Sequence, residues 1–248
     1  MELYFLGTVA GTPSKERNVS STSLKLYNER GTFWLFDCGE GTQHQILRSS
    51  LRLSKLEYIF ITHMHGDHVY GLPGLLTSRS YHEGAAPLKI YGPSGIREYL
   101  ETVLRLSQAH LDYHLTIEEI HHDEHSIETL FEDEQFIVKT AWLNHRVPCL
   151  GYRIEEKQRM GKLRQEKLAE LGIKPGPVYA EIKAGKNITL PDGQTLPAKD
   201  YLDAAPPGRV LTILGDTRPC EQATKLAANA DVLVHEARFA ADKEDLAE

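Results

Sequence analysis

Short apolar runs separated by turn residues recur along the chain and predict β-strands. The predicted strands span Leu3–Leu6, Ser23–Tyr27, Thr32–Asp37, Tyr58–Thr62, Leu88–Tyr91, Gln135–Thr140, Val210–Leu214 and Asp231–His235. Between two of them, residues 96–106 place Ile96, Leu100, Val103 and Leu104 on one face of a helix. Hairpin-like strands early in the chain and helices interspersed later predict mixed β-sheets covered by helices.

The stretch from about Glu155 to Pro197 has a different pattern from the rest of the chain. A charged, helix-like piece is followed by the sequence GIKPGP at residues 172–177. Pro175 and Pro177 remove two backbone donors and bias their neighbours away from helical geometry. We therefore predict a single domain over residues 1–248, with a flexible arm inserted at about residues 155–195.

Composition limits the class of protein. Of the 248 residues, 41% are hydrophobic and 25% are charged, which is typical of one globular domain. No run approaches about 18 consecutive apolar residues, and the first seven residues carry an acid where a signal peptide carries basic residues. The sequence thus predicts neither a membrane span nor a secretory signal. The three cysteines, Cys38, Cys149 and Cys220, form no CxxC pair, which favours a reducing cytoplasm.

Charge is distributed unevenly along the chain. The formal net charge is −7, which argues against a chain coated in positive charge for binding nucleic acid. Residues 153–186 nevertheless hold nine Lys or Arg against five Glu. Such a basic insertion is suited to gripping a polyanion, although the same pattern is also typical of a solvated amphipathic helix.

The strongest chemical signal is the sequence HMHGDH, which directly follows a predicted strand. On an extended chain His63 and His65 point to the same side. A glycine then lets the backbone turn, so that Asp67 and His68 present their side chains from another direction. Imidazole and carboxylate groups are common protein ligands of zinc. These six residues therefore suffice for two adjacent metal sites.

Further side chains of the ligand type follow other apolar runs. Asp37, His145 and Asp216 each lie at or just after the end of such a run. Binding sites in mixed α/β folds concentrate at such a rim, so these three side chains are expected to converge on the histidine loop. A single Asp at a strand end is commonly a turn residue. These three residues therefore indicate a metal site only as part of a complete pattern.

That pattern resembles the metallo-β-lactamase superfamily, through HxHxDH at residues 63–68, His145 and Asp216. Within the superfamily the chain is similar to the ribonuclease Z family from its first residue to its last. More specific matches are PxKxRN at residues 13–18, FDCGEGTQ at 36–43, GLPG at 71–74 and VHEA at 234–237. This set is far more specific than the metal motif alone.

The resemblance implies an αββα four-layer sandwich that holds two zinc ions per complete subunit. One ion would bind three imidazoles, the second would bind a carboxylate and an imidazole, and a further carboxylate would bridge the ions. In that order, the implied ligands are His63, His65 and His145, then Asp67 and His68, and finally Asp216. Two ions about 3.5–4 Å apart can share a hydroxide and neutralise phosphate oxygens during in-line attack.

The same resemblance implies an endoribonuclease that removes the 3′ trailer from precursor tRNA and leaves a 3′-hydroxyl. Asp67 matches the family's general base, and His235 matches a histidine near the leaving 3′ oxygen. The arm would grip the tRNA elbow by RNA shape more than sequence. The implied RNA-binding residues are Pro13, Lys15, Arg17, Asn18, Lys157, Arg159, Lys162, Arg164, Lys167, Lys174, Gly176 and Pro177. The resemblance further implies a homodimer in the cytoplasm, with no membrane association.

One departure from the family concerns the second zinc site. In the family another zinc-binding histidine lies well beyond the segment around His235, together with the closing strand and helices, whereas this chain ends at Glu248. The sandwich is therefore expected to lack its last strand and helices, and the second site is expected to be incomplete. Residues 240–248 read as the start of a helix cut short, which favours a chain that is incomplete relative to the native protein. Arg238 also stands where the family usually has Thr.

Two other functions stay open on the sequence alone. A metallo-hydrolase of small molecules such as thioesters or lactones would carry the same metal loop. A catalytically impaired tRNA-binding form would be consistent with the absent ligand. A second histidine-rich segment, HHDEH at residues 121–125, lies among charges between predicted strands, and we interpret it as a solvated turn.

Overall fold

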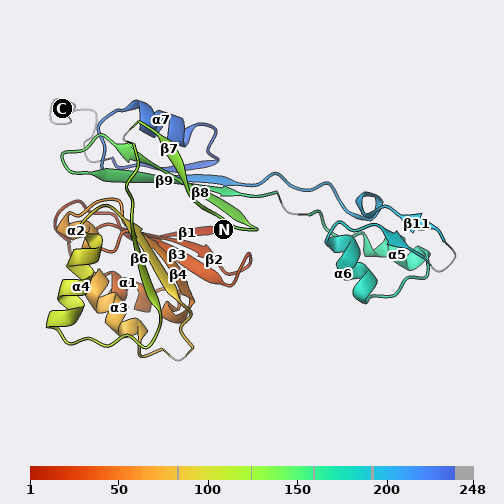
Figure 1. Ribbon diagram of the computed structural model, residues 1–248, viewed down its shortest axis with the longest axis horizontal. Coiled ribbons are helices and arrows are strands. Elements are labelled where there is room, and N and C mark those ends of the chain that lie inside the picture. Colours follow the sequence, from red (N-terminus) through yellow and green to blue (C-terminus); the bar gives the residue numbers. More distant parts are fainter. Residues whose placement is uncertain (83, 124, 159, 191–192, 238–248) are drawn as a thin grey trace.

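Two β-sheets pack face to face and carry helices on their outer faces, in the αββα arrangement (Figure 1). The computed structural model describes residues 1–82, 84–123, 125–158, 160–190 and 193–237. No helix among these residues is long and apolar enough to cross a membrane. The fold class expected from the sequence is confirmed in this arrangement.

The first sheet has six strands in sequence order. They are β1 (Glu2–Gly7), β2 (Ser21–Leu26), β3 (Thr32–Phe36), β4 (Leu56–Phe60), β5 (Leu88–Gly92) and β6 (Leu115–Glu119). The first three are antiparallel neighbours, and β3 to β6 run parallel. The helices of this half are α1 (Thr42–Leu47), α2 (Gly66–Val69), α3 (Leu72–Arg79) and α4 (Ile96–Leu106).

The second sheet has five strands in the order β13-β12-β9-β8-β7. Their bounds are β7 (Ile127–Glu132), β8 (Phe136–Leu143), β9 (Cys149–Glu156), β12 (Val210–Leu214) and β13 (Val232–Val234). All neighbours are antiparallel except β12 and β13. Helix α7 (Glu221–Ala227) covers the outer face of this sheet (Figure 1).

Alternation along β3 shows how the layers are held together. Phe33 and Leu35 belong to the apolar cluster beneath the helices of the first half. Trp34 and Phe36, on the other face of the strand, belong to the cluster between the two sheets. The Trp34 ring lies 5.1 Å from the ring of Phe136 on β8, measured between centroids. Both faces of β3 are therefore buried, and the strand ends at the rim of the sandwich.

The arm is a small folded module that projects to one side of the two sheets (Figure 1). It contains α5 (Gln165–Glu170), α6 (Pro177–Lys183) and a hairpin of β10 (Ile188–Thr189) with β11 (Thr195–Leu196). Its own apolar cluster includes Leu168, Tyr179 and Ile182. The arm leaves from β9 and returns at β12, and its ends meet where the N–H of Glu156 donates to the carbonyl of Arg209 at 2.8 Å.

Most predicted elements agree with the structure. The expected helix at residues 96–106 and the strand Val210–Leu214 match α4 and β12 at both ends. Strands β6, β7, β9, β10 and β11 were not predicted. β7 has three partly buried and three exposed residues in an order without clear alternation. β9 continues to Glu156 and therefore overlaps the expected start of the arm. Arg238 and the expected helix start at 240–248 lie outside the described residues.

Candidate metal centre

The histidine loop begins where β4 ends and turns into α2. Thr62 and His63 are buried, with His63 0% exposed. His65 has extended backbone geometry at the start of α2. A Cβ atom at Gly66 would collide with the ring of Tyr70, so the absence of a side chain lets this ring lie against the loop. The sheet thus fixes the first histidine, and the turn redirects the residues that follow.

Three imidazoles form the first group of donors. One ligand nitrogen from each of His63, His65 and His145 lies within 4.8 Å of the other two. The Nε2 atoms of His63 and His145 are buried and have no hydrogen-bond partner among the described residues. Buried polar atoms are normally paired. A metal ion shared by the three nitrogens fits this arrangement.

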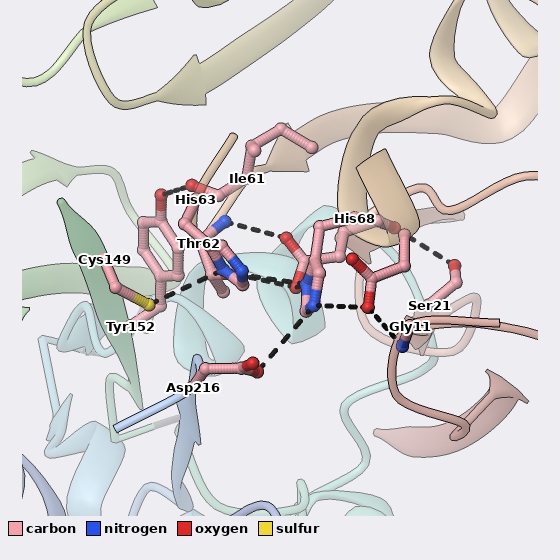
Figure 2. Close-up of polar contacts among 11 residues, drawn as sticks. Gly11, Ser21, Ile61, Thr62, His63, His68, Cys149, Tyr152 and Asp216 are labelled. Atoms are coloured by element: carbon pink, nitrogen blue, oxygen red, sulfur yellow. Dashed lines mark hydrogen bonds and ion pairs between the residues drawn. The ribbon is translucent and has the colours of Figure 1, made fainter. Parts of the chain in front are cut away.

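His68 is at the centre of the second group of donors (Figure 2). Its Nε2 lies 3.6 Å from Asp67 Oδ2 and 3.7 Å from Asp216 Oδ1. Two ligand atoms on a tetrahedral zinc ion are about 3.4 Å apart. Donor atoms of His63, His68 and Asp216 also lie within 4.8 Å of one another, so the two groups adjoin.

Asp37 fixes the orientation of His68. Its Oδ2 accepts hydrogen bonds from His68 Nδ1 at 2.7 Å and from the Thr62 hydroxyl at 2.8 Å. Its Oδ1 accepts the backbone N–H of Thr62 at 2.7 Å. Because Nδ1 donates to Asp37, Nε2 of His68 is left to face Asp67 and Asp216. Carboxylates commonly support metal-binding histidines in this way.

Thr62 fixes the orientation of His63 in a similar way, through a hydrogen bond to its Nδ1. The Thr62 hydroxyl donates to Asp37, so its oxygen is left to accept from His63 Nδ1 at 3.0 Å. Cys149 Sγ lies 3.7 Å from the same nitrogen. Nε2 of His63 therefore keeps its lone pair toward the donor group.

The three imidazoles of the first group favour the neutral form. Burial lowers the pKa of His63 to about 3. The pKa values of His65 and His145 are also lowered, mainly by burial. Only a neutral imidazole binds a metal ion. The first group is therefore in the protonation state that a ligand set requires.

Carboxylates dominate the second group. Burial disfavours the charged form of His68, but Asp37 outweighs this effect and raises the pKa of His68 to about 9. The pKa of Asp216 is raised, first by burial and then also by the negative charges of Glu236 and Asp37. The pKa of Asp67 is lowered, because hydrogen bonding from a backbone N–H and nearby histidines outweigh its burial. His68 is therefore protonated at neutral pH without a metal ion, and a cation bound among these carboxylates would displace that proton.

The role of Asp37 can be tested directly. Asp37→Asn keeps the shape of the side chain and removes the charge that supports His68, so metal affinity is expected to fall about tenfold to a hundredfold. Chelator competition on the purified protein measures this change. Asp112→Asn, at an exposed aspartate, serves as the matched control. Equal affinity in the two variants would show that Asp37 does not support the site.

The loop between β1 and β2 reaches over the second donor group. The backbone N–H of Gly11 donates to Asp67 Oδ2 at 2.7 Å (Figure 2). Pro13, Lys15 and Arg17 follow on this loop and are exposed. Two cationic side chains of the expected RNA-binding set are thus on a loop that contacts the Asp67 carboxylate.

Asn18 has a structural position at the other end of this loop. Its side-chain amide donates to the carbonyl of Glu40 at 2.7 Å. Its own carbonyl accepts the N–H groups of Thr8 and Val9. Asn18 therefore anchors the loop against the chain around Glu40, while its expected contact with RNA stays a prediction.

The structure does not bring His235 into contact with the donor groups in the described part of the chain. The side chain is exposed, and its Nδ1 lies 2.8 Å from the carbonyl of Glu236. The carboxylate of Glu236 instead approaches the rim, where it accepts the N–H of Thr217 at 2.7 Å. The catalytic role expected for His235 stays a prediction.

The expected RNA-binding residues of the arm occupy different settings. Lys157 lies at the end of β9 and pairs with Glu132 at 2.5 Å. Arg164 pairs with Asp203 at 2.9 Å. The remaining described members are exposed: Lys162, Lys167, Lys174, Gly176 and Pro177. Arg159 lies outside the described residues.

The positive charge of the arm is smaller than the sequence count suggested. Residues 160–203 hold seven Lys or Arg and six Asp or Glu. Part of the positive excess counted over residues 153–186 comes from Arg153, which does not belong to the arm. Arg153 pairs with Glu155 at 2.6 Å and donates to the carbonyl of Leu226 at 2.8 Å. Contact between the arm and RNA stays a prediction, and net charge alone does not support it.

The HHDEH segment does not join the metal centre. His121 and His125 are exposed. The His122 ring lies 5.5 Å from the Trp142 ring, and its carbonyl accepts the indole N–H at 3.1 Å. None of the three belongs to a metal-like donor group in the described ranges. Glu124 lies outside them.

Of four supporting groups at this rim, the sequence placed only Asp37 near the histidine loop, and it assigned Asp37 no role. Asp37 stands at the expected rim, but strand-end aspartates are common and carry no signal of their own. The Thr62 hydroxyl and the N–H of Gly11 depend on tertiary contacts. The carboxylate of Glu236 lies in the VHEA motif, where only the histidine has a role from the resemblance.

The fold and the paired donor groups define a protein of the metallo-β-lactamase fold. The solved structure of human tRNase Z, short form, superposes with a TM-score of 0.72 and 31% identity, covering 99% of this chain and 82% of that chain. YhfI from Bacillus subtilis, a metallo-β-lactamase fold protein, has a TM-score of 0.59 at 16% identity over 97% of this chain and 72% of its own, which shows the shared fold.

Sequence relatives identify the family. Ribonuclease Z of Bacillus licheniformis is 53% identical over 247 residues, covering 100% of this chain and 79% of the relative. Ribonuclease Z of Lactiplantibacillus plantarum is also 53% identical, with 78% of the relative covered. A family model described as anti-Pycsar protein Apyc1 matches residues 1–157 and ends where the arm begins. The chain belongs to the ribonuclease Z family.

Proposed function

We propose that this protein is a zinc-dependent endoribonuclease that removes the 3′ trailer from precursor tRNA and leaves a 3′-hydroxyl on the tRNA. The observation that carries the proposal is the convergence of two adjoining donor groups beneath a loop with exposed Lys15 and Arg17. The ribonuclease Z relatives match this chain over its full length, including the arm. Family membership makes the protein a hydrolase.

The donor groups fit two divalent cations. His63, His65 and His145 would hold one, and Asp67, His68 and Asp216 would surround the other, with Asp216 as the bridge. Cations bound there would polarise the scissile phosphate and supply hydroxide at neutral pH. A set of imidazoles and carboxylates without thiolate suits zinc and also manganese.

The side chains at and around these donors are proposed to transfer protons or to contact RNA. Asp67 carries a carboxylate that the Gly11 N–H holds in place, and this carboxylate is proposed to take the proton of the attacking water. His235 is proposed to donate a proton to the leaving 3′ oxygen, and its exposure leaves it accessible to RNA. Lys15 and Arg17 would contact the RNA backbone beside the cleft.

The arm is proposed to bind tRNA away from the cleavage site. Lys162, Lys167 and Lys174 are exposed on a module whose own apolar cluster holds it folded. Gly176 and Pro177 begin α6 next to Lys174 and present backbone without bulky side chains. The enzyme is further proposed to act in the cytoplasm as a homodimer, and a monomeric mass in light scattering at micromolar concentration would contradict the dimer.

A second candidate is a hydrolase of small molecules. It is favoured by the family model that covers most of the metal ligands within residues 1–157 but stops at the arm. Such an enzyme would have no use for an RNA-binding module. Affinity for tRNA therefore separates the two functions.

Incubation with a 3′-extended precursor tRNA and Zn²⁺ or Mn²⁺ tests the proposal. The expected products are a tRNA with a free 3′-hydroxyl and a released trailer, and chelation should abolish their formation. An intact precursor after prolonged incubation, together with hydrolysis of a small phosphodiester, would favour the second candidate.

A further inference from the structure

Two arginines lie beside His145 and belong to neither donor group. Arg146 directly follows His145, and Arg218 comes two residues after Asp216. The N–H of Arg218 donates to the carbonyl of Asn144 at 2.8 Å, which joins the two segments side by side. Both arginine side chains are exposed.

The backbone on which these arginines stand is fixed. Besides the bridge to Arg218, the N–H of Asn144 donates to the Thr217 hydroxyl at 3.2 Å. Neither Arg146 nor Arg218 forms an ion pair with a carboxylate within the described ranges, whereas Arg30, Arg153 and Arg209 all do. Their charges are therefore left to face solvent at the rim of the metal centre.

Positive side chains beside a cation-binding site are electrostatically unfavourable unless an anion offsets their charge. Arg146 is the chain neighbour of His145, and Arg218 is bridged to Asn144 and lies two residues from Asp216. Their positive charges would oppose a bound metal ion. An anion that lies between the arginines and the metal centre would remove this repulsion.

A phosphodiester has the required chemistry. The guanidinium group offers a planar set of donors that matches two phosphate oxygens at once. Lys15 and Arg17 already form a basic flank on the loop that contacts Asp67. Gly11 of that loop and Asp216 approach His68 from different sides (Figure 2). Arg146 and Arg218 supply a second basic flank, next to His145 and Asp216.

We propose that Arg146 and Arg218 bind a backbone phosphate of the RNA next to the scissile one, so that the strand crosses the metal centre between two basic flanks. This inference rests on the proposed function, because it names a further substrate contact of the same site. It assigns the pair to substrate binding, not to metal binding or folding.

Kinetics of single variants over a range of salt concentrations test the pair. The variants are Arg146→Ala, Arg218→Ala and the corresponding lysine substitutions, with Arg105→Ala on α4 as an exposed control. Each alanine variant is expected to lower kcat/KM for precursor tRNA about tenfold through KM. It should also reduce the slope of log kcat/KM against log salt by about 0.7, the loss of one contact to single-stranded RNA. Lysine should recover the salt slope but only part of the affinity.

Two further readouts separate substrate binding from a structural role. Zinc content and Tm of the alanine variants should equal those of the unsubstituted protein, and hydrolysis of bis(p-nitrophenyl) phosphate should change less than twofold. Alanine variants that match Arg105→Ala on precursor tRNA overturn the inference, as does an equal loss on both substrates. An unsubstituted protein that never cleaves precursor tRNA overturns the proposed function first and the inference with it.

Discussion

Asp67→Asn is expected to lower cleavage of precursor tRNA by about a thousandfold or more. The substitution removes both a carboxylate ligand and the proposed proton acceptor, and loss of a general base alone costs a hundredfold to ten-thousandfold. The amide oxygen can still accept the N–H of Gly11, so the loop contact at 2.7 Å and the fold should survive. Single-turnover cleavage at saturating enzyme isolates this effect from RNA binding.

Two controls make this result specific. Asp112→Asn changes an exposed aspartate in the same chemical way and should cleave at the parental rate. RNA affinity of Asp67→Asn, measured by filter binding, should stay within about threefold of the parent, since most phosphate contacts lie elsewhere. Cleavage within tenfold of the parent would remove Asp67 from the reaction.

Removal of the arm is expected to separate tRNA recognition from phosphodiester hydrolysis. A short Gly-Ser linker in place of residues 158–207 can join β9 to β12, because the N–H of Glu156 already donates to the carbonyl of Arg209 at 2.8 Å. Precursor tRNA affinity should fall about a hundredfold, the usual scale for loss of a second linked binding site. Hydrolysis of bis(p-nitrophenyl) phosphate should stay within twofold, because the arm has its own apolar cluster.

Charge substitutions within the intact arm refine this test. Replacing Lys162, Lys167 and Lys174 with alanine should weaken precursor tRNA binding and its salt dependence. Replacing Glu166, Glu170 and Glu181 with glutamine, a matched change of opposite sign, should strengthen binding. Equal affinity in the parent, both triple variants and the armless protein would show that the arm does not bind tRNA.

The convergence of the histidine loop could be predicted from the sequence because its information is local. His63, His65, Asp67 and His68 lie within six residues, and the alternation of an extended chain with one glycine turn already separates their directions. His145 and Asp216 are remote from this loop in sequence. Each follows an apolar run, however, and strands of this kind of fold end at a common rim. The structure brings five of these six residues into the two donor groups within 4.8 Å and places Asp67 3.6 Å from His68.

The sequence placed Asp37 at the rim, but its hydrogen bonds to His68 and Thr62 could not be predicted because they are tertiary contacts. Asp37 contacts His68 only because β3 and β4 are parallel neighbours that end at the same rim. Its bonds to Thr62 follow from that register. The arm could be predicted only in part. Its prolines and glycines indicated an irregular insertion. The apolar cluster of Leu168, Tyr179 and Ile182 was not predicted, because it joins short segments with weak periodicity.

The central claim is that two divalent cations lie where these donors converge. Anomalous diffraction above and below the zinc absorption edge, on crystals of protein purified without chelator, tests it most directly. The account predicts one zinc peak among the imidazoles of His63, His65 and His145, and a second, weaker peak beside Asp67, His68 and Asp216, where the ligand set is expected to be incomplete. Absence of any anomalous peak at these donors after zinc loading would contradict it.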